Sequence, residues 1–537
     1  MNGRIAGIRG VNRRIPPAIG PRQAQPRQAG PSAGGTDAGA RRMPGWQTDG
    51  MAAHATVVGS GPNGLTAAAT LARAGLRVRV LEAADTIGGG LRTEALTLPG
   101  FRHDVCSAVH PAALTSPVFR ALGLDRDVSW LIPEASFAHP LDRAPAAIAW
   151  RDIDLTAHDL GPDGRAWLAT VRPLARHIDE LVSFTGDQLI RTPRHPVTAV
   201  RYGFRVLEQG TRLGARSFRT PRAAALLAGA MAHANTWMPS LASAAAGLLL
   251  TAQAHAGGWP VPSGGAQVIA EALAADIRAH GGVIETGTRV TSLDDLDWGD
   301  PAAGDLLILD TSPRLLLTAS ALPTAYARAV RHYRYGPGVM KVDIALAGPI
   351  PWRDPDVGRA PTVHLGGTRE EIIAAEQDVA RGRIPANPYV LAVQPSVIDP
   401  TRAPAGKAVL WAYTHVPLGS TTDATAAVLA QVERFAPGVR DLILAVHATT
   451  AAARVRTNPA EIGGDISGGA FTMTQAIRRP VVSRHPWRTP LPGVYLASSS
   501  TPPGPGVHGM SGWHAARTAL SDGAGVPVTL DDLFGDD

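Results

Sequence analysis

The chain has 537 residues, an apolar content of 45% and a mean hydropathy close to zero, values typical of a large globular enzyme. Its longest apolar run, residues 241–250, is far shorter than the roughly 18 residues of a membrane span, so we expect a buried helix there. Cys106 is the sole cysteine, which excludes an intramolecular disulfide, a dithiol redox pair and a cysteine zinc site. We interpret Cys106 as a buried, inert thiol.

The formal net charge of +6 lies entirely in residues 1–50, which hold eight arginines and two acidic residues. The rest of the chain is balanced, so we expect no nucleic-acid partner for the folded part. The composition of residues 1–50 predicts a disordered basic tail. Either Met51 is the natural start of a bacterial cytoplasmic protein, or the tail is an organelle-targeting peptide. The excess of arginine over the two lysines, with the high alanine content, is typical of a GC-rich bacterial genome and favours the first explanation.

The first predicted unit is a β-branched strand, the pattern G-x-G-x-x-G, an Ala-rich helix ending near Gly75, and a second strand that stops at Glu82. Gly59 suits a tight turn, Gly61 lets the backbone approach a pyrophosphate, and Gly64 allows the helix to pack closely on the sheet. Phosphates bind at the N–H groups of such a helix N-terminus. An acid at the position of Glu82 hydrogen-bonds a ribose hydroxyl. Together these features predict a dinucleotide site.

Three consecutive glycines, residues 88–90, follow this unit and indicate a backbone that passes close to the same cofactor. Residues 106–256 show helical patterns. Within them, residues 191–222 hold eight arginines and only one acid, Glu208. This run is either a solvated helix surface or a face that meets anionic lipid. The Ala- and Leu-rich residues 223–254 suit plain helix packing or the wall of a tunnel for a lipid-like substrate.

The second half of the chain alternates helical and strand patterns. A Gly-rich segment opens a helix, followed by a strand-like run and by an apolar strand of the kind found in buried parallel sheets. Further strands around one helix predict a separate mixed sheet. In chain order these are the Gly-rich segment 257–265, helix 267–280, the strand-like run ending at 288–291, strand 305–310, strands 341–346, 390–394 and 408–414, and helix 369–381.

The last predicted block is a strand at 493–500, a glycine loop at 504–509 and a helix at 511–520. The loop satisfies G-x-G-x-x-G formally, but no second strand with a terminal acid follows before the chain ends. We therefore interpret it as a helix N-terminus directed at the reactive ring of the same cofactor, and not as a second nucleotide-binding unit.

These blocks, in this order, resemble the FAD-dependent phytoene dehydrogenase-like branch of the flavin amine oxidase superfamily. That branch includes carotenoid desaturases, retinol saturase and, with particular similarity, the pyridine nucleotide-disulfide oxidoreductase domain-containing protein two group. The resemblance covers residues 52–525. Besides the glycine loops, the matching motifs are residues 257–265, 338–343, 351–352, 394–396, 399–404 and 463–465.

The resemblance implies an α/β fold with a Rossmann-like FAD-binding domain, built from a parallel sheet with helices and a β-meander, interleaved with a mixed-sheet and helical substrate domain. The FAD domain would comprise residues 51–105, 257–320 and 455–525, and the substrate domain 106–256 and 321–454, with 526–537 as a tail. Val290 would bind adenine through its backbone, and residues 506–510 would meet the isoalloxazine. The residues expected to contact FAD are Gly59, Ser60, Gly61, Pro62, Asn63, Gly64, Glu82, Ala83, Gly88, Gly89, Gly90, Arg92, Val290, Gly506, Val507, His508, Gly509 and Met510.

The reaction implied is hydride transfer between a hydrophobic, isoprenoid-, carotenoid- or retinoid-like substrate and flavin N5. Lys341 and His508 are the candidate catalytic side chains, whereas His233, His255 and His514 read as core histidines; no metal site is expected. One alternative is amine oxidation, with Tyr495 and Trp513 as candidates for an aromatic cage. Another is a flavin-binding regulator without efficient turnover. Peripheral membrane contact is a further expectation, and the pattern does not predict an oligomeric state.

Overall fold

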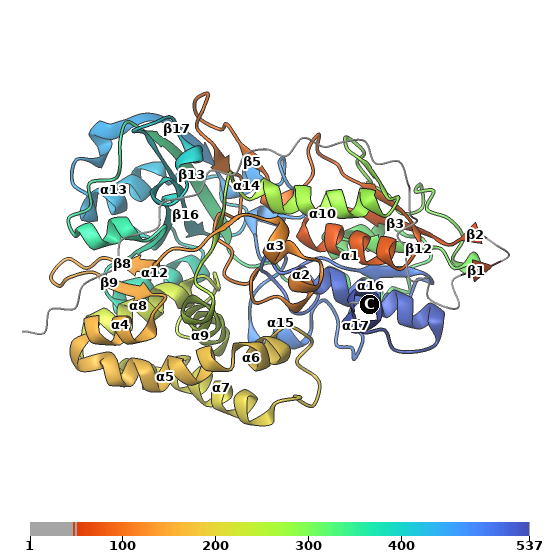
Figure 1. Ribbon diagram of the computed structural model, residues 1–537, viewed down its shortest axis with the longest axis horizontal. Helices are drawn as coiled ribbons and strands as arrows, with labels where there is room; N and C mark the ends of the chain where they lie inside the picture. The colour runs from red at the N-terminus through yellow and green to blue at the C-terminus, as the bar shows by residue number, and fades with distance from the viewer. Residues whose placement is uncertain (1–46, 49–50, 536–537) are drawn as a thin grey trace, which may run out of the picture. The chain divides into compact units, whose positions relative to one another are not determined.

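A five-stranded parallel sheet gathers strands from the two ends and the middle of the chain (Figure 1). The computed structural model describes residues 47–48 and 51–535. In the strand order β11-β4-β3-β12-β18, the central strand is β3, the first of the five in the chain. Its neighbours β4 and β12 follow it by tens and by hundreds of residues. The strands are β3 (His54–Val58), β4 (Arg77–Leu81), β11 (Val283–Glu285), β12 (Leu306–Leu309) and β18 (Val494–Leu496).

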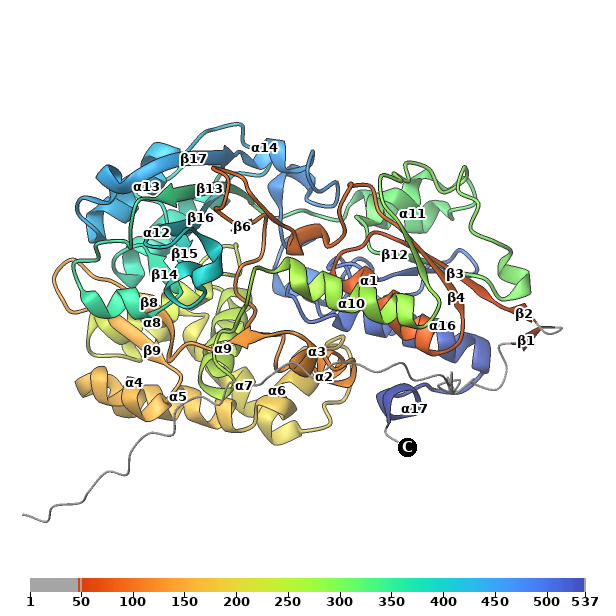
Figure 2. The same ribbon diagram turned by 45° about the horizontal axis from the view of Figure 1, so that its top comes forward.

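Helix α1 (Pro62–Arg73) connects β3 to β4 as the glycine pattern predicts. Proline at the first helical position suits a helix start, because its missing N–H has no intrahelical partner there. Gly75, with φ of +91°, follows the helix in the left-handed region that ends many helices. In both views α1 lies between α10 (Gln267–Ala279) and α16 (Met510–Ala524), and the three helices share one buried core with the sheet (Figure 2).

A seven-stranded mixed sheet forms the second half of the structure, in the order β17-β13-β16-β15-β14-β8-β9. The three expected strands are present as β13, β15 and β16, and the expected helix as α12. Four further strands, β8, β9, β14 and β17, were not predicted from the sequence. The two short, Ala-rich strands β8 and β9 are buried along their whole length, lack the polar–apolar alternation that identifies strands, and contain a single β-branched residue, Ile148. The strands are β8 (Ala135–His139), β9 (Ala147–Trp150), β13 (Gly338–Leu346), β14 (Thr362–Leu365), β15 (Val390–Val393), β16 (Ala408–Val416) and β17 (Ile443–Thr449).

Helices cover one side of the mixed sheet, and small residues let them pack closely. A Cβ at Gly247 on α9 would lie 2.4 Å from Met231 on α8, and one at Gly229 would lie 2.6 Å from His364 on β14. The apolar run 241–250 is thus part of a packed helix, as expected, and no helix within residues 51–535 is long and apolar enough to cross a bilayer. The helices here are α4 (Ile153–Asp159), α5 (Gly164–Arg176), α6 (Ile178–Thr185), α7 (Pro196–Gln209), α8 (Pro221–Ala232), α9 (Leu241–Ala256) and α12 (Arg369–Ala380).

Shorter elements complete the described chain. The remaining helices are α2 (Pro117–Ala121), α3 (Leu124–Asp127), α11 (Thr324–Arg331), α13 (Thr425–Phe435), α14 (Ala451–Arg454), α15 (Met473–Ile477) and α17 (Leu530–Phe534). The remaining strands are β1 (Gln47–Thr48), β2 (Met51–Ala52), β5 (Thr93–Glu94), β6 (His103–Asp104), β7 (Trp130–Leu131) and β10 (Val261–Pro262).

Two expectations for the parallel sheet are wrong. The strand expected to run to residues 288–291 ends at Glu285, because Gly287 turns the backbone with φ of +68°. The expected β-meander is missing, since the described residues between β11 and β12 form turns and one short 3₁₀ helix. That segment is rich in Asp and Gly, which favour turns over strands. The five-stranded and the seven-stranded sheet each draw their strands from one of the two expected domains, whereas β10 pairs with β7 across them, so the domain bounds stay a prediction. The described residues 51–535 belong to one compact unit. The tail predicted at residues 1–50 lies mostly outside the described residues.

Several motif residues act as long-range clamps. Trp352 Nε1 donates to Gln394 Oε1 at 3.0 Å, and Gln394 Nε2 donates to the carbonyl of Ala360 at 2.8 Å. Asp399 Oδ2 accepts from Gly264 N at 2.8 Å. Because each bond joins segments far apart in the chain, these motifs fix the fold around the site and need not take part in its chemistry.

The contact between α16 and α1 generates a stability prediction. A Cβ at Gly512 on α16 would lie 1.9 Å from the carbonyl oxygen of Asn63, a backbone atom that cannot rotate away. We expect Gly512→Ala to lower the free energy of unfolding by about 2 kcal/mol or more, against a helix-propensity gain of about 1 kcal/mol. Urea unfolding measures the difference.

The matched control is Gly257→Ala, where a Cβ meets nothing within 4 Å and φ is −120°. We expect the control to stay within about 0.5 kcal/mol of the parent. Equal stability of Gly512→Ala and the parent would contradict the close approach of the two helices.

Candidate functional site

One cavity of about 1110 Å³ is lined by residues from both sheets. At one end lie the carboxyl ends of the parallel strands, represented by Val58, Leu81, Asp310 and Ser498. Open α/β sheets bind their ligands outside these strand ends. At the other end lie helices α7 and α9 with strands β15 and β16. The cavity therefore joins a nucleotide-binding edge to the core of the second half.

The three motif glycines are required by close backbone contacts. A Cβ at Gly59, whose φ is +99°, would lie 2.5 Å from the carbonyl oxygen of Asp310, and one at Gly61 would lie 2.6 Å from its carboxylate. A Cβ at Gly64 would lie 2.1 Å from the carbonyl oxygen of Gly59. The turn thus fits only without side chains, and Asp310 forms the surface against which it closes.

Asp310 is the functional residue that sequence reasoning missed. It follows β12, and its Oδ2 accepts from Gly64 N at 2.8 Å, inside the first turn of α1. Burial raises the pKa of the Asp310 carboxyl to about 7, the Gly64 N–H opposes this shift, and the Glu82 charge adds to it. The sequence shows that Asp310 follows an apolar strand. It does not show that this strand, β12, pairs with β3, the strand before the glycine turn.

Glu82 lies at the end of β4 and is engaged on both carboxylate oxygens. Oε2 accepts from Ser60 N at 2.9 Å and from Ser60 Oγ, and Oε1 accepts from Ala84 N at 2.8 Å. Oε1 retains a second lone pair, so a ribose hydroxyl can still donate to it. Ser60, Pro62, Asn63 and Ala83 also line the cavity.

The second glycine run closes on the first. Gly88 N donates to the carbonyl oxygen of Ser60 at 3.0 Å, and a Cβ at Gly89 would lie 3.1 Å from Gly61 Cα. Gly89 and Gly90 line the cavity together with Arg92 and Cys106. Cys106 is therefore half-buried on the cavity wall and not in a closed core, but burial raises its pKa to about 12 and keeps the thiol protonated.

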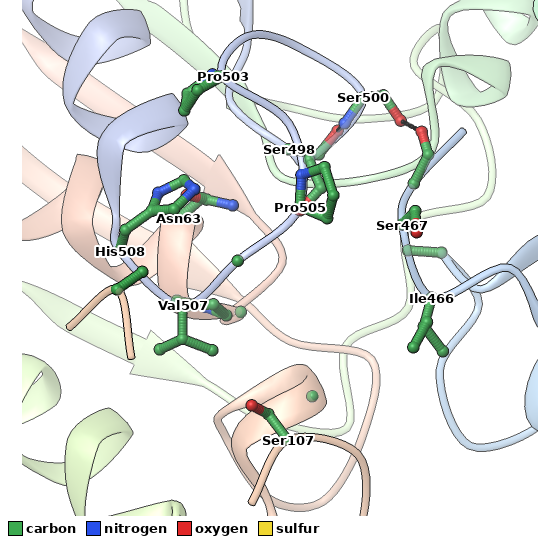
Figure 3. Close-up of a pocket in the computed structure, with 18 of the residues that line it drawn as sticks. Asn63, Ser107, Ile466, Ser467, Ser498, Ser500, Pro503, Pro505, Val507 and His508 are labelled. Carbon is green, nitrogen blue, oxygen red and sulfur yellow. Dashed lines mark hydrogen bonds between the residues drawn. The ribbon is translucent and has the colours of Figure 1, made fainter. Parts of the chain in front are cut away.

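The loop before α16 supplies the opposite rim. Pro505, Val507 and His508 of this loop line the cavity together with Asn63 from the start of α1, and Figure 3 shows His508 next to Asn63. His508 Nδ1 accepts from Met510 N at 3.1 Å, and burial lowers the His508 pKa to about 4. His508 is thus a neutral imidazole that orders the helix start. Gly506 and Met510 also line the cavity.

Three expected contact residues lie outside the cavity lining and have packing roles. Gly64 and Gly88 hold the two glycine turns together through the contacts above. At Gly509 a Cβ would lie 2.4 Å from Thr66 on α1, so this glycine lets the two helices meet. Val290 does line the cavity, in the segment without regular secondary structure after β11. Contact of each of these residues with a cofactor stays a prediction.

Lys341 lies in the middle of β13, away from the cavity. Its side chain is 3% exposed, its ammonium donates to Asp343, and it lies 5.5 Å from the ring centroid of Trp411. Burial lowers the Lys341 pKa, while the Asp343 carboxylate opposes this shift. The water-positioning role expected for Lys341 therefore has no support in the geometry, and it is not a surface lysine either. It stands behind an aromatic residue of the cavity wall.

The second half of the cavity is apolar. Helix α9 contributes one face, from positions spaced three and four residues apart, and β16 contributes an aromatic pair. The rings of Trp411 and Tyr413 lie 5.2 Å apart at 75°. The lining residues from these elements and from α7 and β15 are Ala199, Tyr202, Gly203, Val206, Ala242, Ala245, Ala246, Leu249, Leu250, Gln253, Leu391, Val393, Trp411 and Tyr413.

The described residues fit FAD at this site. Helices α1 and α16 both begin at glycines, which have no side chain to cap the helix, and residues at both helix starts line the cavity. Their dipoles favour an anion there, although Gly64 N and Met510 N already donate to Asp310 and His508. Asn63 Oδ1 is buried at the cavity with no partner among the described residues. No cluster of His, Cys, Asp or Glu in that part of the chain is arranged to hold a metal ion. The fold and site thus define a dinucleotide-dependent oxidoreductase.

Residues 63–520 match the model of the flavin-containing amine oxidoreductase family, so the chain belongs to this family and its cofactor is FAD. The family expected from the motifs is confirmed. Pyridine nucleotide-disulfide oxidoreductase domain-containing protein 2 of mouse is 24% identical over 87% of this chain and 93% of its own length. The rat protein of the same name is 26% identical, and that match covers 50% of this chain and 52% of the rat protein's length.

Two further similarities concern a short segment of sequence and the fold. One subunit of the limonene dehydrogenase of Castellaniella defragrans is 41% identical over 13% of this chain and 13% of its own length. The solved structure of a putrescine oxidase double mutant covers 87% of this chain and 98% of its own, with 16% identity and a TM-score of 0.57. That structure confirms the fold class, an α/β fold with a parallel sheet and a mixed sheet.

Asp310 predicts a pH dependence of cofactor binding. Its pKa of about 7 means that the carboxyl beneath the glycine turn becomes charged as the pH rises through 7. Since that charge repels a pyrophosphate, FAD affinity should fall several-fold between pH 6 and 8. The Asp310→Asn variant keeps an oxygen that accepts from the Gly64 N–H but carries no charge. The FAD affinity of this variant should therefore vary less with pH than that of the parent, and titration by flavin fluorescence measures both.

The same change has a stability readout without cofactor. The folded pKa of Asp310 lies above its ordinary value of 3.8, so its contribution to stability falls as the pH rises from about 4 to 7. Asp310→Asn should gain stability relative to the parent over that interval. Asp305→Asn, at the other end of the same strand, is the matched control and should show neither effect. Parallel pH profiles for all three proteins would contradict this role.

Proposed function

We propose that the protein adds or removes two hydrogen atoms across a carbon–carbon bond of a hydrophobic, uncharged substrate of isoprenoid-like character. FAD, when bound, supplies the hydride acceptor or donor for this reaction. The second hydrogen leaves or arrives as a proton. The protein's own residues bind the two reactants next to each other and exclude water.

The apolar wall carries this proposal. None of the lining residues contributed by α7, α9, β15 and β16 is charged. A substrate carrying a charge would lose its hydration there without a counter-ion, whereas a hydrocarbon gains from burial. Tyr202 donates its hydroxyl to the carbonyl of Ala245 at 2.7 Å, so even this polar group is occupied.

The three histidines that line the cavity, His110, His233 and His508, are held neutral by burial, which suits hydride transfer without a charged nucleophile. Burial lowers the pKa of His233 to about 3, and its Nε2 pairs with Nε2 of His364 at 2.8 Å. His233 thus belongs to the cavity wall as well as to the core. Burial also lowers the pKa of His110 to about 4.

The short similarity to one subunit of a limonene dehydrogenase supports the same substrate class, because limonene is a hydrocarbon. The second candidate is amine oxidation, which the family and the putrescine oxidase fold favour. Its expected cage residues do not line the cavity: Tyr495 donates its hydroxyl to Asp522 at 2.9 Å, and Trp513 packs against Phe534. The Trp411–Tyr413 pair is the aromatic feature that such a reaction would use.

Anaerobic loss of the visible flavin absorbance separates the candidates. We expect bleaching with an isoprenoid hydrocarbon or a retinoid for a desaturase, or reoxidation of reduced enzyme by the unsaturated compound for a saturase. Bleaching by amines alone would favour amine oxidation. Retained FAD with no response to hydrocarbons, retinoids, amines or NAD(P)H would favour the flavin-binding regulator.

A cavity-filling substitution tests the substrate wall. Ala246 lies on the cavity face of α9, so Ala246→Phe should slow the reaction with the hydrophobic substrate by about tenfold or more while FAD content is unchanged. Ala256→Phe adds the same volume at the exposed end of the helix and should react at the parental rate. Stopped-flow absorbance measures both, and equal rates for the two variants would place the substrate elsewhere.

A further inference from the structure

Helix α7 carries a stripe of large apolar side chains on its solvent-exposed face. Val197, Val200, Phe204 and Leu207 are 68%, 58%, 68% and 51% exposed. Their spacing of three, four and three residues places them along one side of the helix. Leu213, 61% exposed, extends the stripe beyond the helix end. Contiguous exposed apolar surface of this kind is uncommon on a protein without a partner.

The opposite side of the same helix faces the cavity. Ala199, Tyr202, Gly203 and Val206 line it, again at spacings of three, one and three residues. Helix α7 therefore separates the apolar cavity from the exposed stripe by a single layer, at the edge of the molecule formed with α5 and α6 (Figure 1). The lining continues through Leu189 in the connection from α6 to α7.

Residues 191–222, which contain the stripe, hold eight arginines with few acids to neutralise them. Arg205 pairs with Glu208 at 2.6 Å, Arg191 lies 3.6 Å from Asp187, and Arg222 pairs with Asp159. Within the described part of the chain, the other arginines of this run form no ion pair with an acidic side chain. They are Arg194, Arg201, Arg212, Arg216 and Arg219.

We propose that α7 docks on an anionic lipid bilayer, with the four-residue stripe in the acyl boundary and the flanking arginines at the lipid phosphates. Helices that lie in a bilayer surface combine these two features. A second copy of the chain is a poorer occupant, because a symmetric contact would bring the unpaired arginines of both copies together. Docking of α7 on the bilayer does not depend on the proposed function. Exchange of a hydrophobic substrate between the bilayer and the cavity beside α7 does rest on it.

Vesicle co-sedimentation of the full chain tests the docking. Val200→Ser/Phe204→Ser removes apolar surface, and Arg201→Glu/Arg212→Glu reverses charge. With vesicles of phosphatidylcholine and phosphatidylglycerol we expect each pair to lower the partition coefficient by about tenfold or more, and pure phosphatidylcholine to bind the parent weakly. Flavin absorbance of each variant confirms that it is folded and loaded.

Matched controls come from exposed positions elsewhere. Leu444→Ser/Val446→Ser removes similarly exposed apolar side chains on β17, and Arg278→Glu/Arg331→Glu reverses exposed charges on α10 and α11. Both should bind vesicles like the parent. Because the basic residues 1–50 are present in every protein compared, their contribution cancels.

Three outcomes would overturn the proposal. Parental binding by both α7 variants would assign vesicle binding to another part of the chain. No binding of the parent to anionic vesicles would exclude a membrane partner. A parental dimer that the Val200→Ser/Phe204→Ser variant converts to monomer, seen by sedimentation velocity, would assign the stripe to a second copy. Flavin bleaching in solution is measured separately, so failure of the proposed function leaves a docking result intact.

Discussion

The site depends on the contact between the first turns of α1 and α16, two helices separated by more than four hundred residues of sequence. Gly512 meets the carbonyl of Asn63 and Gly509 meets Thr66, at distances that leave no space for a Cβ. Because the helices touch at their N-terminal ends, both dipoles point to one cavity. A flavin dinucleotide carries negative charge at the pyrophosphate and, on reduction, at the flavin. Two converging helix N-termini can therefore stabilise both of these charges.

The local structure of this half of the site could be predicted from the sequence because its determinants are local, whereas the contact of its residues with FAD stays a prediction. The order of strand, glycine turn, helix, strand and acid fixes where Gly59, Glu82 and the start of α1 lie, whatever the rest of the chain does. The α16 loop was found for the same reason. Asp310 was missed because its role depends on β12 pairing with β3, a contact across some 250 residues that no spacing reveals. Strands β8 and β9 were missed because burial, and not residue type, makes them strands.

Lys341, a rare charged residue that the sequence offered as a catalytic candidate, is buried in an ion pair, and its catalytic role stays a prediction without support from the geometry. The structure instead places three close ion pairs around the substrate half: Lys341 with Asp343, Arg454 with Glu461, and Arg402 with Asp104. Buried pairs contribute little net stability but are costly to break singly. The Trp411 ring lines the cavity and lies 5.5 Å from the Lys341 ammonium, so this aromatic side chain, and not the lysine, belongs to the cavity wall, whereas Glu461 of the second pair lines the cavity itself.

The two sides of α7 connect the substrate class with the location of the protein. The uncharged wall that α7, α9, β15 and β16 contribute to the cavity selects against charged substrates, and a molecule that prefers such a wall also prefers a bilayer to water. For such a substrate the costly step is transfer through water, which a direct path from the bilayer avoids. An exposed apolar stripe is a liability for a protein that collects polar amines from solution, because it favours aggregation without serving access. Its position, one helix away from the uncharged wall, therefore favours a hydrophobic substrate over an amine.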